Sequence, residues 1–228
     1  MTVHAASPAV LVELNDLSAG LFLLCAFGMV ATRQALACLR LFITQSFFFG
    51  VSALLVGIHP LAWDLIAVGL LNFVTKMFLI PWLLRHTVRE EVYERREIVQ
   101  VLNVPTSLLI ALGLTIVAYF VAVPMLRAVG EMGYAKVNVP IGLAALLLGV
   151  YTLAVRREAV PQLIGLLAME NGAFFAGIAI VSGLSLIAEL AIAFDALMLA
   201  FVMGVLTKAI QEHVGTTEAG GLALLREK

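Results

Sequence analysis

Three ionisable side chains lie inside long apolar runs of this sequence. Lys76 lies in LLNFVTKMFLIPWLL, Glu170 in LLAMENGAFF and Asp195 in AIAFDALMLA. A charge near the centre of a bilayer costs at least about 2.5–3.5 kcal/mol, a cost that leucine or alanine would avoid. Carboxyl and amino groups kept from water can exchange protons near neutral pH. The pattern therefore predicts that Glu170, Asp195 and Lys76 form a proton relay.

Four further polar residues are candidates to support such a relay. Asn72 precedes the buried lysine by one helical turn and lies on the same face, and Asn171 directly follows the buried glutamate. Glu189, in the outer part of its apolar run, is either the mouth of a proton path or a water-facing helix end. Asp64 is more typical of a solvated helix end.

Each buried group also has an interpretation without proton transfer. A protonated carboxyl at Glu170 or Asp195 can donate a hydrogen bond between helices. Lys76 lies about two turns from the end of its predicted span, so its aliphatic stem can carry the ammonium group partway to the surface. The sequence leaves these alternatives open.

Other kinds of site find little support. The two cysteines, Cys25 and Cys38, lie outside any paired motif, whereas iron–sulfur clusters normally need four. No two histidines have the spacing of metal ligands, and no glycine-rich phosphate-binding loop occurs. The net charge of −1 does not favour a nucleic-acid partner. We therefore expect no cofactor, no metal and no nucleic acid.

The elements that must hold these residues are membrane helices. The chain of 228 residues is 62% hydrophobic and only 13% charged, whereas soluble domains carry about 25% charged residues. A membrane-spanning helix needs about 20 mostly apolar residues. The sequence predicts an all-α polytopic membrane bundle of seven spans, at 16–32, 35–58, 61–84, 104–126, 137–155, 161–182 and 184–207.

The basic residues predict the orientation of the bundle in the bilayer. With the N-terminus outside, only Arg127 and Lys136 fall in outer connections. The eleven basic residues of the cytoplasmic side are then Arg33, Arg40, Arg85, Arg89, Arg95, Arg96, Arg156, Arg157, Lys208, Arg226 and Lys228. We therefore expect a multi-pass protein of a bacterial or archaeal cell (inner) membrane, with the N-terminus outside and the C-terminus in the cytoplasm.

A faint internal repeat divides the chain into units. Each of two units has a span, a basic cytoplasmic turn and two spans joined outside, so that Arg33 corresponds to Arg157. Such repeats are common among membrane transport proteins. The predicted parts are an N-terminal three-helix unit with its cytoplasmic loop (1–103), a linking helix with an outer loop (104–136), a second three-helix unit (137–212) and a flexible cytoplasmic tail (213–228).

Three motifs resemble one family of membrane subunits. TKMFLIPWLL around Lys76, LLAMENGAFFAGIAI around Glu170 and FDALMLAFVMGVL around Asp195 resemble, in this order, hydrogenase-4 component E. The last three spans are also similar to the small K subunit of complex I, which has a basic turn, here Arg156-Arg157-Glu158, before its two acids. The third-span acid of the K subunit is a glutamate, whereas this chain has an aspartate one methylene shorter.

The resemblance implies a non-catalytic membrane subunit of an oxidoreductase complex related to hydrogenase-4 or formate hydrogenlyase. It implies that Glu170 and Asp195 are an acid pair in the line of buried charges that crosses the membrane arm of such complexes. The implied partners are antiporter-like and other membrane subunits, the lipid bilayer and, indirectly, a peripheral nickel–iron hydrogenase module. The sequence does not decide between H⁺ and Na⁺ or identify the electron donor.

Two other functions fit parts of the sequence. In the first, the protein is a structural scaffold of the same complex, and the buried charges serve only helix assembly. In the second, it is a free-standing small-solute carrier, because three spans, one span and three spans is an arrangement of small sugar transporters. Their Pro-Gln dipeptide also occurs here, at Pro161-Gln162.

Overall fold

The computed structural model describes residues 8–58, 61–87, 102–129 and 133–180, together with positions 201, 202 and 204. The regular elements of this part of the chain are helices. Six helical stretches in it are long and apolar enough to cross a membrane. The predicted helical membrane architecture is thus confirmed in its coarse form. The predicted seventh span, 184–207, lies outside the described residues apart from those three positions.

The helices follow the apolar runs of the sequence. A single span consists of α3, η1 and α4, which continue one another, and η1 is a π-helix. The first helix begins at Pro8 rather than at residue 16, because polar residues of its early turns, such as Asn15, are buried in the bundle. The bounds are α1 Pro8–Ala31, α2 Ala35–Ile58, α3 Trp63–Asn72, η1 Phe73–Leu79, α4 Ile80–Thr87, α6 Val104–Val129, α7 Ala135–Val155 and α8 Ala159–Ile180.

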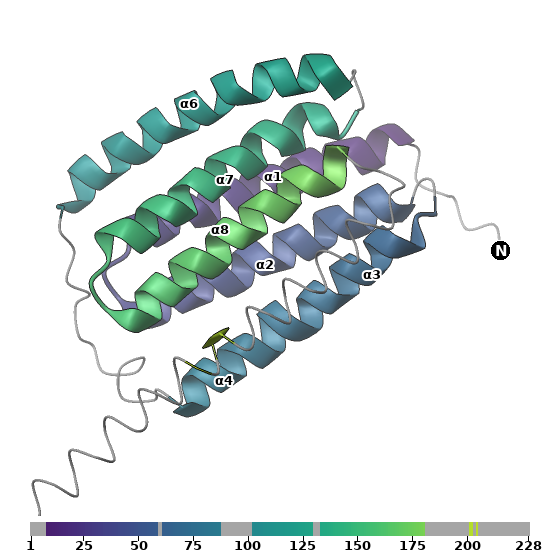
Figure 1. Ribbon diagram of the computed structural model, residues 1–228. Coiled ribbons are helices and arrows are strands. Elements are labelled where there is room, and N and C mark those ends of the chain that lie inside the picture. The colour runs from purple at the N-terminus through teal and green to yellow at the C-terminus, as the bar shows by residue number, and fades with distance from the viewer. Residues whose placement is uncertain are drawn as a thin grey trace, which may run out of the picture.

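Four helices form the centre of the described bundle (Figure 1). Here α1 packs on α2 and α7, and α8 packs on α7 and α2. The α3–η1–α4 span covers α2 on one side, and α6 covers α7 and α1 on the other. The corresponding helices of the predicted repeat, α1 with α7 and α2 with α8, are therefore neighbours, as in parallel repeats. The division into units itself stays a prediction.

Aromatic rings fill the space where α1, α2 and α8 meet. The rings of Phe22 and Phe175 stack with their centroids 4.2 Å apart, and Phe49 lies 6.4 Å from Phe175. All three side chains are buried. In a bilayer, where lipid is as apolar as leucine, such close packing is a main source of helix association.

Large apolar side chains also point outward from the bundle. Leu109 and Phe120 of α6, Leu24 of α1 and Trp63 of α3 are all more than half exposed. Contiguous apolar exposure of this extent is unfavourable in water and favourable in lipid. The outer faces of the helices are therefore suited to contact with acyl chains.

Glycines bring α7 and α8 into direct backbone contact. A side chain at Gly149 of α7 would meet the backbone of Met169, and one at Gly172 of α8 would meet the backbone of Leu146. Small residues that let two helix backbones approach closely are typical of membrane interfaces. These glycines fix α8 against α7, and with it the helix that carries Glu170.

The glycine contact gives a first prediction. Gly172→Ala should lower the free energy of unfolding by about 1–3 kcal/mol, because the added methyl group forces two backbones apart. Gly177→Ala, five residues along the same helix, is the matched control, since nothing lies within 4 Å of the added carbon. The measurement is the apparent melting temperature in detergent micelles. Equal melting temperatures of the two variants would contradict the close packing of α7 and α8.

Candidate functional site

A buried ion pair joins the third span to α8 near the middle of the bundle. The Nζ atom of Lys76 lies 3.1 Å from Oε1 of Glu170, and each side chain is only 1% exposed. Lys76 lies in η1 of the third span, and Glu170 lies near the middle of α8 (Ala159–Ile180). Lys76 and Glu170 are 94 positions apart in the sequence, and the fold brings these two predicted relay residues together.

Asn171 completes the first set of contacts to the lysine. Nζ of Lys76 donates a hydrogen bond to Oδ1 of Asn171, at 3.0 Å. The same Nζ lies 5.7 Å from the centroid of the Phe174 ring, within the range of a cation–π attraction. Among the described residues, the ammonium group therefore contacts a carboxylate, an amide oxygen and an aromatic face. The Lys76 side chain therefore does not extend to the surface of the bundle.

Ser46 of α2 links the two asparagines that the sequence singles out. Asn171 donates through Nδ2 to the Ser46 hydroxyl oxygen, at 2.9 Å, and Asn72 donates through Nδ2 to the Ser46 carbonyl, at 2.6 Å. All three side chains are buried. Sequence reasoning missed Ser46. Its only signal in the sequence is that it ends a run of three polar residues, Thr44, Gln45 and Ser46, inside the apolar stretch FITQSFFFG.

The backbone around Lys76 is irregular. Residues Phe73–Leu79 form a π-helix, in which the Ile80 N–H donates to the carbonyl of Thr75, five residues back. Pro81 follows directly and has no N–H to donate, so the regular α-helical ladder cannot run through this point. Short π-helical segments inside α-helices are frequent at functional sites. The extra residue in this turn sets the direction in which Lys76 leaves its helix.

Further buried polar atoms accompany the pair. Gln45 is fully buried, and among the described residues neither of its amide atoms has a hydrogen-bond partner. Oδ1 of Asn72 is in the same situation. Buried polar atoms in proteins are commonly satisfied by ordered water. These atoms could therefore hold water molecules beside the network.

The remaining predicted relay residues are not part of the described pair. Asp195 and Glu189 lie outside the described residues. Asp64 is exposed in the first turn of α3, twelve residues before Lys76 and so about 18 Å away along the helix. The described site thus consists of the ion pair with Asn171, Ser46 and Asn72.

A second polar cluster, which sequence reasoning missed, connects three helices nearer one end of the bundle. Asn15 of α1 and Asn138 of α7 exchange amide hydrogen bonds of 2.8 and 3.2 Å. Ser52 of α2 donates to Asn15 at 2.6 Å and accepts from Asn138 at 3.1 Å. All three are fully buried. The cluster has no ionisable member, and its contacts serve to join helices.

At the opposite end of the bundle, Arg156 has a structural role. Its Nη2 donates to the carbonyls of Met29 and Thr32, at 2.8 and 2.6 Å, where α1 ends. The last carbonyls of a helix have no partner within the helix and carry partial negative charge. Arg156 is only 3% exposed. One arginine of the predicted basic turn therefore caps a neighbouring helix.

Six helices of membrane-spanning length and apolar composition place this chain among multi-pass helical membrane proteins. It is 32% identical over 214 residues to the uncharacterized protein Rv0085 of Mycobacterium tuberculosis, an alignment that covers 94% of this chain and 96% of the relative. The chain belongs to the same family as Rv0085. No family model and no solved structure matches it.

The ion pair makes a testable prediction about stability. Lys76→Met and Glu170→Leu should each destabilise the protein by about 3–5 kcal/mol, because each leaves one buried charge uncompensated. The double variant should regain most of that loss, since apolar residues of similar volume often replace a buried pair without cost.

Thermal unfolding in detergent, followed by the loss of the monodisperse chromatographic peak, measures these effects. Phe78→Leu is a suitable control, because Phe78 lies on the same π-helical turn and is exposed. Single variants as stable as the unaltered protein, or a double variant with additive losses, would show that the two charges are not paired.

Proposed function

We propose that this protein is the membrane subunit of a hydrogenase-4-like energy-converting redox complex. In this proposal the Lys76–Glu170 pair takes part in moving protons through the membrane. One observation carries the proposal: the pair lies in the interior of an apolar bundle, at 3.1 Å and out of contact with solvent.

The physical argument rests on what a buried pair costs. Removing two charges from water costs several kcal/mol for each ion, and their attraction often does no more than offset it. A bundle that needed only stability would do as well with two apolar side chains. A pair that can pass one proton between the lysine and the carboxylate offers something that apolar residues cannot.

The surroundings of the pair suit a change of protonation. The Asn171 oxygen can accept a hydrogen bond from the lysine whether the amino group is charged or neutral. Asn171 is in turn fixed by Ser46. Lys76 itself lies in the π-helical turn Phe73–Leu79, and such turns are frequent at functional sites. The site therefore combines a titratable pair, an adaptable acceptor and an irregular backbone.

The family resemblance supports the same function from a separate direction. The motif TKMFLIPWLL contains Lys76, and LLAMENGAFFAGIAI contains Glu170, Asn171 and Phe174. These two stretches supply the ion pair, the amide acceptor and the ring beside Nζ. The residues on which the resemblance rests are thus the ones that meet in the site.

A structural scaffold of the same complex is the second candidate function. The observation in its favour is the presence of two further buried polar clusters, around Asn15 and around Arg156, which join helices without any group suited to proton transfer. If the Lys76–Glu170 pair is a third cluster of this kind, its charges are dispensable for transport as long as the bundle assembles.

Proton transport by the assembled complex distinguishes the two candidates. We expect the rate of proton uptake into inverted membrane vesicles to fall about 100-fold in Glu170→Gln and in the double variant K76M/E170L. This is the lower end of the range for loss of an acid–base group. The amount of assembled complex should stay unchanged in the double variant. Thr152→Val is the matched control, because within the described part of the chain its buried hydroxyl bonds only the Leu148 carbonyl of its own helix.

Full transport by the double variant would refute the proton-transfer role and favour the scaffold.

The redox partner is tested separately, by purification of the full-length protein in mild detergent. We expect a nickel–iron hydrogenase module and antiporter-like subunits to co-purify. A protein that purifies alone and takes up a small solute in vesicles would be the carrier instead.

A further inference from the structure

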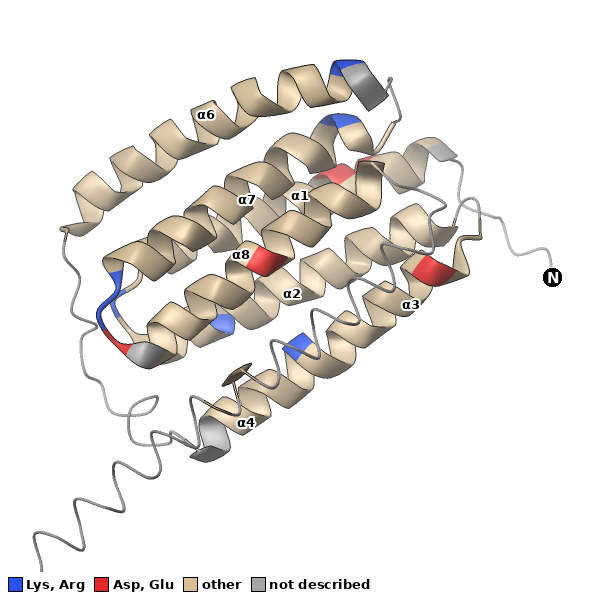
Figure 2. Cartoon of the chain, in the orientation of Figure 1, with Lys and Arg blue, Asp and Glu red and all other residues tan. Residues whose placement is uncertain are grey.

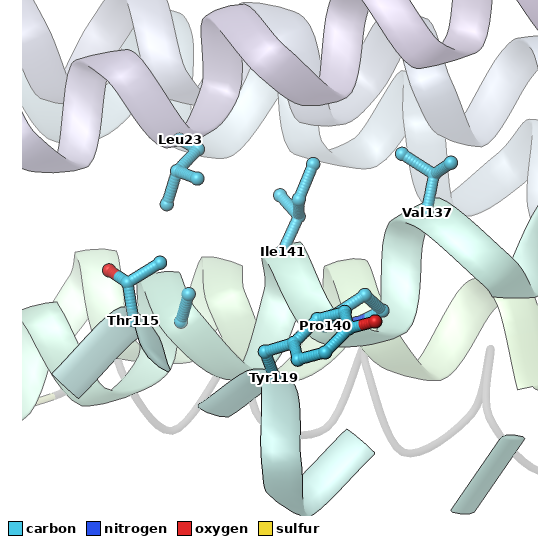
Figure 3. A pocket seen from close by; sticks show the side chains of 7 residues that line it. Leu23, Thr115, Tyr119, Val137, Pro140 and Ile141 are labelled. Atoms are coloured by element: carbon cyan, nitrogen blue, oxygen red, sulfur yellow. The ribbon is translucent and has the colours of Figure 1, made fainter. Parts of the chain in front are cut away.

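An apolar groove lies on the far side of the bundle from the ion pair, between α1, α6 and α7 (Figure 3). Its volume is about 210 Å³. The side chains around it come from all three helices, and the atoms that face the groove are almost entirely apolar. The lining residues are Leu23, Thr115, Tyr119, Val137, Pro140, Ile141 and Ala144.

The groove occupies one half of the depth of the membrane. On α7 it runs from Val137, near the start of the helix, to Ala144, which is about 10 Å along the axis. On α6 it reaches Thr115, near the middle of that helix. One leaflet of the hydrocarbon core is about 15 Å thick. The groove therefore lies within a single leaflet.

Two basic residues stand at the end of the groove that faces the membrane surface. Arg127 is in the last turn of α6 and Lys136 in the first turn of α7, and both are exposed. Their neighbours Leu126 and Ala135 belong to one packed cluster, in which this end of α6 meets the start of α7. Figure 2 shows basic positions at the same end of the adjacent helices α6 and α7.

The direction of Lys136 connects the charges with the groove. Lys136 and Pro140 are one helical turn apart, so the lysine stands above a lining residue on the same face of α7. The acids at this end of the described bundle are Glu13 and Asp16 of α1 and Asp64 of α3. None of the three lies on α6 or α7, the helices of the two basic residues.

We propose that this groove binds a membrane glycerophospholipid, with its phosphate at Arg127 and Lys136 and one acyl chain along the groove. The basic side chains supply donors for an anionic phosphate, and the apolar walls match the methylene groups.

The lipid site does not depend on the proposed redox function. It is tested by native mass spectrometry of the delipidated full chain in detergent, with added phosphatidylglycerol, phosphatidylethanolamine or phosphatidylcholine that carries oleoyl chains. We expect the protein to retain one phospholipid. In the double variant R127Q/K136Q, binding should weaken about 30-fold, since one basic residue near a membrane surface contributes about fivefold.

A second variant tests the groove itself. Thr115→Phe places a ring in the groove and should also abolish lipid retention. Leu109→Phe adds a ring to the same helix at a position 70% exposed and should have no effect. Circular dichroism and gel filtration confirm that each variant folds.

Retention of lipid at the unaltered level by both R127Q/K136Q and Thr115→Phe would overturn the site. Loss of binding on removal of the charges, with no effect of Thr115→Phe, would reduce it to a surface contact and overturn the groove as the binding site. A third outcome is that the unaltered protein retains no phospholipid and that a partner subunit protects Tyr119 from labelling. The groove would then be a protein contact instead.

Discussion

The ion pair between Lys76 and Glu170 is the interaction on which the organisation of this bundle depends. Two opposite charges buried in an apolar interior are stable only at close distance and with their other hydrogen bonds made. This requirement fixes the spacing of the third span and α8. It also explains why Ser46 and Asn171 are polar at positions where an ordinary membrane helix would carry leucine.

The pair can be held this tightly because α8 is fixed on its other side. Gly172 brings the backbone of α8 against α7. Glu170 precedes this glycine by two residues, so its side chain leaves the helix about 200° away, on nearly the opposite face. The face of α8 that packs on α7 therefore positions the helix, and the face that carries the charge is directed at the third span. Packing and chemistry are separated on one helix.

Three buried polar groups are spaced along the described bundle. The asparagine–serine cluster joins α1, α2 and α7 nearer one end, the ion pair lies in the middle, and Arg156 caps α1 at the other end. Between them the interior is mostly aromatic and aliphatic, with the stacked rings of Phe22 and Phe175. The middle group alone is an acid–base pair. This difference is the structural reason to look for proton transfer there rather than at either end.

The sequence by itself determined the helical membrane architecture. It also singled out Lys76, Glu170, Asn72 and Asn171, because a charged or amide side chain in an apolar run can be recognised without knowing its neighbours in space. Only the tertiary structure decided that Lys76 and Glu170 are partners, since helix neighbours depend on packing between distant segments. Ser46 and the asparagine–serine cluster escaped prediction for the same reason: a small polar residue in a span acquires meaning only from the helix it faces. The π-helical turn could not be predicted either. Pro81 shows that the hydrogen-bond ladder must be interrupted, but not which conformation the preceding turn adopts.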